Sequence, residues 1–245
     1  MQQFSVLLGL GALMGLLLIV WRAPKKETSR YLDAALAILF GALLVSRAGY
    51  VAVHLPYFQI HPGEMIQVWK GGLSGIGALA GGAIAILILA GWWRGSTASM
   101  ADVILPLVGT LAITAWLGCW MDSCGYGLPA KAWWALPARD EWGVLAYRVP
   151  VQLMGAFVTL GIIWLLDRVS KRIAIPGISA SLGVFLIAAE IFALSFLRAD
   201  STPLWYGLRL EAWGAIGLMV FYLLIGVVLL FRWKRRSSLS PPDEE

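Results

Sequence analysis

Seven long stretches of apolar, almost uncharged residues constrain this chain more than any other feature of its sequence. They cover 4–21, 32–54, 73–93, 103–121, 151–166, 178–197 and 213–231. A helix of about 20 apolar residues crosses the roughly 30 Å hydrocarbon core of a bilayer. In lipid, a helix satisfies all of its backbone hydrogen bonds within one segment. We therefore predict an all-α integral membrane protein with seven transmembrane helices.

The composition excludes a water-soluble protein of this length. Of the 245 residues, 60% are apolar and 13% are charged, whereas soluble proteins carry about 25% charged residues. The net charge of +5 comes from small clusters near the ends of the predicted helices, so we expect no nucleic-acid partner. Two cysteines are too few for a multi-thiolate metal site, and we expect neither a metal nor another cofactor.

The distribution of basic residues predicts the orientation of the helices. Twelve lysines and arginines lie on one side of the predicted spans and six on the other. The positive-inside rule then places the N-terminus outside and the C-terminus in the cytoplasm. We expect a single transmembrane domain over 1–236, an outer loop over 122–150 that lies on the membrane surface, and a disordered cytoplasmic tail over 237–245.

Ionisable residues inside the predicted spans indicate a functional site. Arg47 and Glu190 each lie about seven residues, or roughly 10 Å, from the outer end of a span, and Asp122, Arg198 and Asp200 follow at the outer ends. A charge in hydrocarbon costs at least a few kcal/mol, so such groups face a cavity or one another. An outward-opening cleft that holds them together is the simplest arrangement, and an anionic phospholipid headgroup is the phosphate that arginine would bind there.

Two other readings of these charges are open. A buried salt bridge, for example between Arg47 and Glu190, would only fix the packing of two helices. A transporter would need charged groups along the whole path across the membrane, and the predicted spans contain them only in their outer halves.

Two short segments beside the spans add candidate residues. The glycine-rich run from Gly71 to Gly75 opens the third span and would let a lipid headgroup approach the backbone, whereas the glycines from Gly77 onward are typical of close helix packing. Cys119 and Cys124 flank Asp122. They are either buried as small apolar side chains or, in an oxidising compartment, joined as a disulfide.

Six sequence motifs in order carry a resemblance to a known family. They are GALLVSRAGY (41–50), WKGGLS (69–74) with Gly77, LGC (117–119) continuing to CGYG (124–127), VPVQL (149–153), FLRAD (196–200) and GLRL (207–210). In these motifs the chain resembles the prolipoprotein diacylglyceryl transferases, seven-helix enzymes of the bacterial plasma membrane, from about Tyr31 to Arg232.

The resemblance implies a reaction and its partners. This family transfers the diacylglyceryl group of phosphatidylglycerol to the lipobox cysteine of a preprolipoprotein, at the outer face of the membrane. The implied partners are phosphatidylglycerol, the preprolipoprotein signal peptide and other membrane lipids, while the sequence does not predict the oligomeric state. A thiolate attacks a glycerol carbon and glycerol phosphate leaves, so a cation must hold the phosphate and a base must accept the thiol proton.

The resemblance also assigns candidate site residues. Arg198 matches a functional arginine of the family and would hold the phosphate. The base would be a substitute outside the family's motifs, namely Glu190, Asp122 or His54. The predicted substrate-binding residues are Arg47, Tyr50, Gly71, Gly72, Ser74, Gly118, Tyr126, Gln152 and Arg209.

The chain departs from the family at polar positions. Ile76 stands where the family often has histidine, Trp116 and Cys119 replace the arginine and asparagine of an Arg-x-Gly-Asn motif, and Met154-Gly155 replace Tyr-Glu. Either other side chains supply the chemistry, or the protein is a phospholipid-binding relative that has lost the transferase activity.

Overall fold

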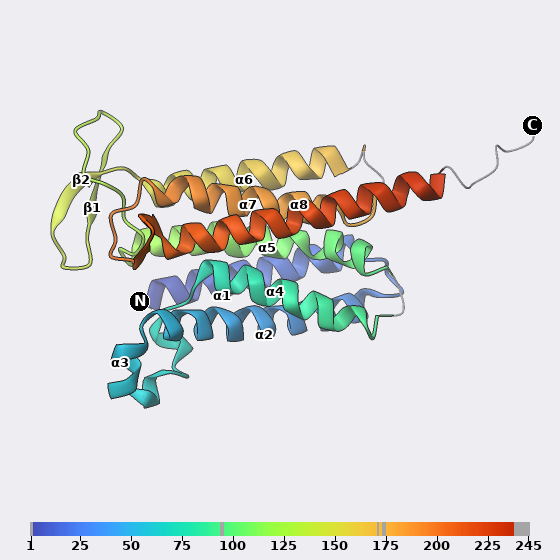
Figure 1. Ribbon diagram of the computed structural model, residues 1–245, viewed down its shortest axis with the longest axis horizontal. Helices are drawn as coiled ribbons and strands as arrows, with labels where there is room; N and C mark the ends of the chain where they lie inside the picture. Colours follow the sequence, from blue (N-terminus) through green and yellow to red (C-terminus); the bar gives the residue numbers. More distant parts are fainter. Residues whose placement is uncertain (1, 94–95, 171, 173–174, 238–245) are drawn as a thin grey trace, which may run out of the picture.

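The computed structural model describes residues 2–93, 96–170, 172 and 175–237, and in them long helices dominate (Figure 1). The seven long helices are α1 (Gln2–Arg22), α2 (Thr28–Val53), α4 (Gly75–Ala90), α5 (Thr97–Met121), α6 (Val151–Ser170), α7 (Ile178–Ser195) and α8 (Leu210–Ser237). Each overlaps one of the predicted apolar stretches. The short elements between α2 and α4 are α3 (Leu55–Ile60), η1 (Pro62–Glu64) and η2 (Val68–Lys70). The prediction of an α-helical protein is confirmed.

Six of the described helices are long and apolar enough to cross a membrane. The remaining long helix, α4, has 16 residues and therefore measures about 24 Å at 1.5 Å per residue. Large apolar side chains such as Phe40, Leu17 and Phe157 lie exposed on the outside of the bundle, between 60% and 71% accessible. A bilayer would cover this surface, and the chain is accordingly a multi-pass membrane protein.

Glycines bring the helices close together. The main packed pairs are α1 with α5, α2 with α4, and α7 with α8. A Cβ atom on Gly41 of α2 would lie 2.9 Å from Cβ of Ala85 of α4, and one on Gly77 would lie 2.9 Å from the carbonyl oxygen of Val45. The predicted packing role of the glycines from Gly77 onward is confirmed.

The outer-loop prediction for 122–150 did not include the hairpin found there. Strands β1 (Leu136–Arg139) and β2 (Leu145–Arg148) pair antiparallel, with Leu136 opposite Arg148. The Asp140 carboxylate accepts the N–H groups of Trp142 and Val144 at 3.0 and 2.8 Å and closes the turn, and its other oxygen pairs with buried Arg148 at 3.0 Å. These contacts join residues two, four and eight positions apart, so they close the hairpin locally.

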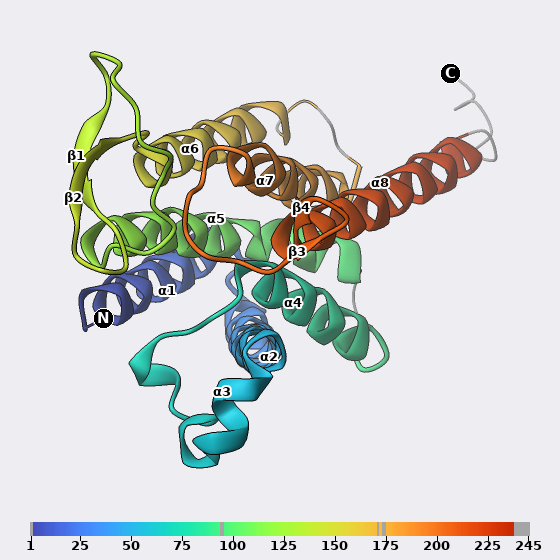
Figure 2. The same cartoon turned by 60° about the vertical axis from the view of Figure 1, so that its left-hand side comes forward.

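A second hairpin, β3 (Leu204–Trp205) with β4 (Leu208–Arg209), lies between α7 and α8 at the same end of the bundle as the first (Figure 2). The chain segments that leave α5 and α7 and those that enter α6 and α8 therefore meet there. The residues that these segments carry form the candidate site.

Asp102 corrects the expectation that spans carry charge only in their outer halves. Helix α5 begins at Thr97, six residues before the predicted start at 103, and so includes Asp102. Its carboxylate accepts the N–H groups of Gly177 and Ala180, at 2.6 and 2.8 Å, at the start of α7. This end of the bundle, opposite the hairpins, also contains a cavity of about 290 Å³ lined by Arg22, Asp102 and Asp167 among others.

Candidate active site

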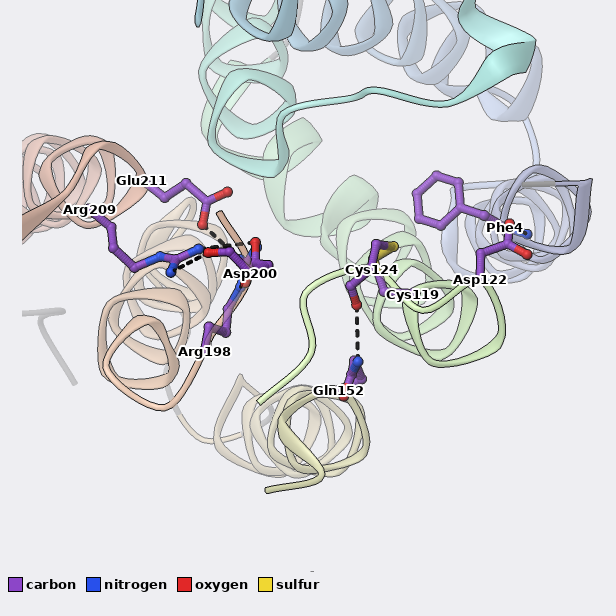
Figure 3. Close-up of a disulfide and its surroundings, with 9 residues drawn as sticks. All are labelled: Phe4, Cys119, Asp122, Cys124, Gln152, Arg198, Asp200, Arg209 and Glu211. Atoms are coloured by element: carbon purple, nitrogen blue, oxygen red, sulfur yellow. Dashed lines mark hydrogen bonds and ion pairs between the residues drawn. A yellow bond between two sulfur atoms is a disulfide. The ribbon is translucent and has the colours of Figure 1, made fainter. Parts of the chain in front are cut away.

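Arg198 is the centre of a charged cluster at the hairpin end of the bundle (Figure 3). It follows α7 directly and pairs with Gly127 in an antiparallel bridge. Its Nε and Nη2 donate to the two carboxylate oxygens of Asp200 at 2.8 and 2.6 Å. Its Nη1 donates to Oε2 of Glu211, in the first turn of α8, at 2.7 Å. Two carboxylates therefore surround this guanidinium.

Arg209 of β4 completes the cluster. Its Nη2 lies 3.0 Å from Oδ2 of Asp200 and donates to Thr202 Oγ1, and its Nη1 donates to the Asp200 carbonyl oxygen at 3.0 Å. The Nε of Arg209 is buried and has no hydrogen-bond partner within the described part of the chain. The four charged side chains, Arg198, Arg209, Asp200 and Glu211, sum to zero charge, and we call them the Arg198 cluster.

Ionisation of the cluster follows from these contacts. Burial raises the pKa of Asp200, but the hydrogen bond from Arg198 and the charges of both arginines outweigh burial and hold that pKa below its ordinary value. Burial likewise opposes the charged form of Arg198, yet its hydrogen bond to Asp200 and the charge of Glu211 raise its pKa above the ordinary value. Arg198 and Asp200 are therefore both charged near neutral pH.

The loop after α5 packs against this cluster. A disulfide joins Cys119 and Cys124. Of the two possibilities for these cysteines, burial as small apolar side chains or a disulfide, the structure has the disulfide. Gly125 follows with φ +60, and a Cβ there would lie 3.5 Å from Arg198 Nε. The buried Gln152 donates from Nε2 to the Cys124 carbonyl at 3.0 Å, and the carbonyl of buried Tyr126 accepts the Ala199 N–H at 2.8 Å. Tyr126, Gln152 and Arg198 thus lie around one loop.

Gly118 and Asp122 are directed toward α1 instead. A Cβ on Gly118 would lie 2.8 Å from the ring of Phe4, and Asp122 Oδ2 accepts the Phe4 N–H at 3.0 Å. Figure 3 shows Phe4 and Asp122 on one side of the disulfide and Arg198 on the other. In this structure both residues hold the start of α1 against the end of α5.

Arg47 forms a second centre, between α2 and the segment before α4. Its guanidinium donates to four backbone carbonyls, those of Met65 at 2.8 Å, Gly71 at 2.6 Å, Gly72 at 2.8 Å and Glu64 at 2.6 Å. Gly71 and Gly72 have φ of +83 and +74, a conformation that favours glycine. A Cβ on Gly72 would meet the ring of Tyr50 at 2.5 Å.

Ser74 belongs to the same centre. Its hydroxyl oxygen caps α4 by accepting the Gly77 N–H at 3.1 Å, and its carbonyl accepts the Ser46 hydroxyl at 2.8 Å. The structure therefore brings together Arg47, Tyr50, Gly71, Gly72 and Ser74. Four of the five N–H groups of Arg47 already bind backbone oxygens, so in this structure the arginine shapes the loop.

Glu190 lies apart from both arginines. Its two carboxylate oxygens lie 3.0 and 2.8 Å from the Thr159 hydroxyl of α6, and the Trp116 side chain also lies within hydrogen-bonding reach. An apolar cluster that includes Leu194 and Leu197 follows along α7 between Glu190 and Arg198.

The expectation of one cleft that holds Arg47, Glu190 and Arg198 side by side stays a prediction, because these three side chains contact different partners in this structure. Across the described ranges, no hydrogen bond or ion pair joins any two of these three side chains, because each has its own partners. The α2–α4 pair carries Arg47 to one part of the bundle, and α6 and α7 enclose Glu190 in another.

Comparison with known proteins identifies the family of this chain. The family model described as prolipoprotein diacylglyceryl transferase matches residues 1–232. The chain belongs to this family. The relative from Symbiobacterium thermophilum, named phosphatidylglycerol–prolipoprotein diacylglyceryl transferase, is 28% identical over 91% of this chain and 86% of its own length. The relative of the same name from Thermosynechococcus vestitus is 28% identical over 83% of this chain and 80% of its own. No solved structure gives a significant match.

In this member of the prolipoprotein diacylglyceryl transferase family, the replaced polar positions are tightly packed. Ile76 fits against Gly214 of α8, where a Cβ would lie 2.5 Å from the Ile76 side chain. The Trp116 indole occupies the space beside Gly155, where any Cβ would overlap the ring. Cys119 is half of the disulfide. The apolar replacements are therefore accommodated by small residues on neighbouring helices.

Sequence reasoning grouped Asp200 with Arg198 but did not select Glu211 or Thr159 as site residues. A signal existed for Glu211, because an acidic residue in the first turn of a long apolar helix needs a partner. A signal also existed for Thr159, which lies seven residues after Gln152 on the same face of α6.

Proposed function

We propose that this protein transfers the diacylglyceryl group of phosphatidylglycerol to the lipobox cysteine of preprolipoproteins. Family membership over residues 1–232 and relatives of that name along most of the chain support this activity. The observation that carries the proposal on the structural side is the pair of guanidiniums, Arg198 and Arg209, held together at one end of an apolar helix bundle. A planar guanidinium binds phosphate oxygens in bidentate fashion.

The reaction follows from the chemistry of its two substrates. The cysteine thiol loses its proton, and the thiolate sulfur attacks the glycerol carbon of the diacylglyceryl group. A carbon–sulfur bond forms as the carbon–oxygen bond to the phosphate breaks, and glycerol phosphate leaves with the bonding electron pair. Arg198, assisted by Arg209, would stabilise the negative charge on the leaving phosphate.

The loop residues would shape the binding site. Tyr126 and Gln152 hold the segment 124–128 that packs on Arg198. Arg47, Tyr50, Gly71, Gly72 and Ser74 would form a second wall, at the loop before α4. Gly118 would act by allowing α1 to approach α5.

Glu190 and Asp122 are the two residues that we propose as candidates for the base that accepts the thiol proton. Asp122 would have to release the Phe4 N–H, which it accepts at 3.0 Å. Glu190 would have to be reached past the apolar cluster that contains Leu194.

The membrane arrangement that we propose has seven spans, with α4 as the shortest, inside one domain over 1–236. The N-terminus and the Arg198 cluster would face outward and the C-terminus would face the cytoplasm of a bacterium, in its plasma membrane. The excess of basic residues at the opposite ends of the helices supports this orientation. The predicted tail over 237–245 lies, except for Ser237, outside the described residues. A C-terminal reporter that is active only in the cytoplasm tests the orientation.

The decisive experiment measures transfer directly. Proteoliposomes that contain the full chain, phosphatidylglycerol labelled in its acyl chains and a lipobox peptide should yield a labelled thioether on the peptide cysteine. Arg198→Gln should abolish the product, while a variant at the exposed Glu141 should retain it. A folded wild-type protein that gives no labelled peptide would rule out the transferase activity.

A second candidate function is phospholipid binding without catalysis. The tight packing of Ile76 and Trp116 in place of polar side chains favours it. In that case the protein would retain phosphatidylglycerol in an Arg198-dependent manner and give no labelled peptide.

A further inference from the structure

Arg148, at the end of the first hairpin, is a buried cation that lies outside the Arg198 cluster. Its side chain and that of Asp140 are only 8% and 9% exposed, and its Nη2 lies 3.0 Å from Oδ2 of Asp140. Among the described residues, no hydrogen bond or ion pair joins Arg148 to a member of the Arg198 cluster. The formal charges of Arg148 and Asp140 cancel, and neither residue touches the groups that would bind phosphate.

The guanidinium of Arg148 contacts two residues of the loop after α5. Its central carbon lies 4.8 Å from the ring centroid of Tyr126, a distance at which a positive charge is attracted to the face of the ring. Its Nη1 donates to the Gly127 carbonyl oxygen at 3.4 Å. A planar guanidinium can offer its face to a ring while its edge binds a carbonyl and a carboxylate, which the ammonium of lysine cannot do. Arg148 thus links Asp140 in the hairpin turn to this loop.

The same segment of the loop lies directly against the strand that ends at Arg148. The Leu128 carbonyl accepts the Val149 N–H at 2.9 Å, and Pro129 forms an antiparallel bridge with Arg148. A Cβ on Gly127 would overlap the Val149 carbonyl oxygen, so the close approach of the two backbones requires glycine. The backbone and the side chain of Arg148 therefore hold the same segment.

The other side of this segment binds the backbone that carries Arg198. The Leu128 N–H donates to the Leu197 carbonyl at 2.9 Å, and the Tyr126 carbonyl accepts the Ala199 N–H at 2.8 Å. These two hydrogen bonds flank Arg198 on both sides. A continuous series of contacts therefore runs from the hairpin, through the segment, to the backbone of Arg198.

Stability alone does not explain a buried ion pair in this place. Desolvation of two charges offsets most of their attraction, so apolar side chains of similar volume would stabilise the fold about as well. What Arg148 and Asp140 add is direction, because a charged hydrogen bond favours one geometry. Direction matters near a reaction centre, since a displacement of about 1 Å can lower a rate about 100-fold.

We propose that Arg148, neutralised by Asp140, is a positioning residue for the diacylglyceryl transfer. It acts through Tyr126 and Gly127, which fix the backbone of Arg198 and so direct its guanidinium at the leaving phosphate. This role rests on the proposed function and adds a residue that touches neither substrate. Loss of the contact would misdirect the charge that stabilises the transition state, and it would leave the binding of both substrates nearly unchanged.

The test compares kcat and KM in the proteoliposome transfer assay, per mole of folded protein. Arg148→Lys keeps a positive charge beside Asp140 and loses the planar fork. Its kcat should fall about ten- to 100-fold, while KM for phosphatidylglycerol and for the lipobox peptide stays within about twofold, the pattern of an interaction made only in the transition state. Hydrogen exchange at the Ala199 N–H, which the Tyr126 carbonyl accepts, should become about tenfold faster.

A matched control makes the same substitution on the same hairpin. Arg139 is exposed and donates to the Gly143 carbonyl at 3.1 Å, and within the described ranges it makes no hydrogen bond to the loop after α5. Arg139→Lys should leave kcat and exchange at Ala199 unchanged. Unchanged kcat in folded Arg148→Lys, a rise in KM alone, or an equal loss in Arg139→Lys would overturn the positioning role. If the wild type itself gave no thioether product, the proposed function would be wrong and this role would fall with it.

Asp140→Asn gives a second test should Arg148→Lys fail to fold. The amide has the size of the carboxylate and keeps an oxygen for the N–H groups of Trp142 and Val144, so the hairpin turn can still close. The substitution removes the charge that balances Arg148 and should lower kcat about tenfold at unchanged KM. A wild-type kcat in this variant would equally contradict the role assigned to Arg148.

Discussion

Removal of the Cys119–Cys124 disulfide should destabilise the protein by about 2 kcal/mol. The bridge joins residues five apart in sequence, so the replacement of both cysteines by serine opens a very short loop. The chain-entropy relation for a loop of about five residues gives a loss of about 7 cal/mol/K, which is about 2 kcal/mol at 25 °C. The loop also carries Gly125, which packs on Arg198, so the double variant should retain phospholipid less well.

Thermal unfolding of the detergent-purified protein, followed by tryptophan fluorescence, measures the effect. For a chain of 150 to 250 residues, a loss of about 2 kcal/mol lowers Tm by about 4–8 °C. A reducing agent should lower the Tm of the wild type by the same amount and leave that of the double variant unchanged. An unchanged Tm together with unchanged lipid retention in the double variant would refute the idea that this bridge supports the site.

Three further predictions test other contacts. Gly155→Ala should cost about 1–3 kcal/mol, because its Cβ would overlap the Trp116 indole. Gly161→Ala in the same helix, where nothing lies within 4 Å, should leave Tm unchanged or raise it. Arg47→Lys loses the planar fork that binds four carbonyls and should speed hydrogen exchange in the loop before α4, whereas unchanged exchange would contradict the loop-shaping role. Contacts with Arg198 and Arg209 outweigh burial and hold the pKa of Asp200 below its ordinary value, so its ionised form stabilises the fold above that ordinary value and this contribution is lost as pH falls through the lowered pKa. The Tm difference between wild type and Asp200→Asn should therefore shrink toward pH 3; a growing difference would contradict this.

The helices could be predicted from the sequence because lipid imposes one simple rule. An apolar stretch long enough to cross hydrocarbon has to be helical, and each of the seven stretches proved to be so. The hairpin of β1 and β2 could not be predicted in the same way. Its two strands have four residues each, which is too short for the alternation of apolar and polar residues to distinguish a strand from a loop.

The sequence predicted candidate residues for the site, and their roles stay predictions. In the structure Tyr126, Gln152 and Arg198, which belong to three different motifs, lie around one loop, and Arg209 pairs with Asp200 beside it. Depth in the membrane suggested that Arg47 and Glu190 would join them, but depth gives no direction around a helix. The side of its helix on which each residue lies decides its partners, which are backbone carbonyls for Arg47 and Thr159 for Glu190.

The fit of Trp116 to Gly155 restricts how this chain can be altered by evolution or by design. An arginine at position 116, which would regain the family's motif, would lose the packing of the indole against Gly155. A glutamate at position 155 would overlap the indole. Each change alone is thus harmful, and the two positions would have to change together.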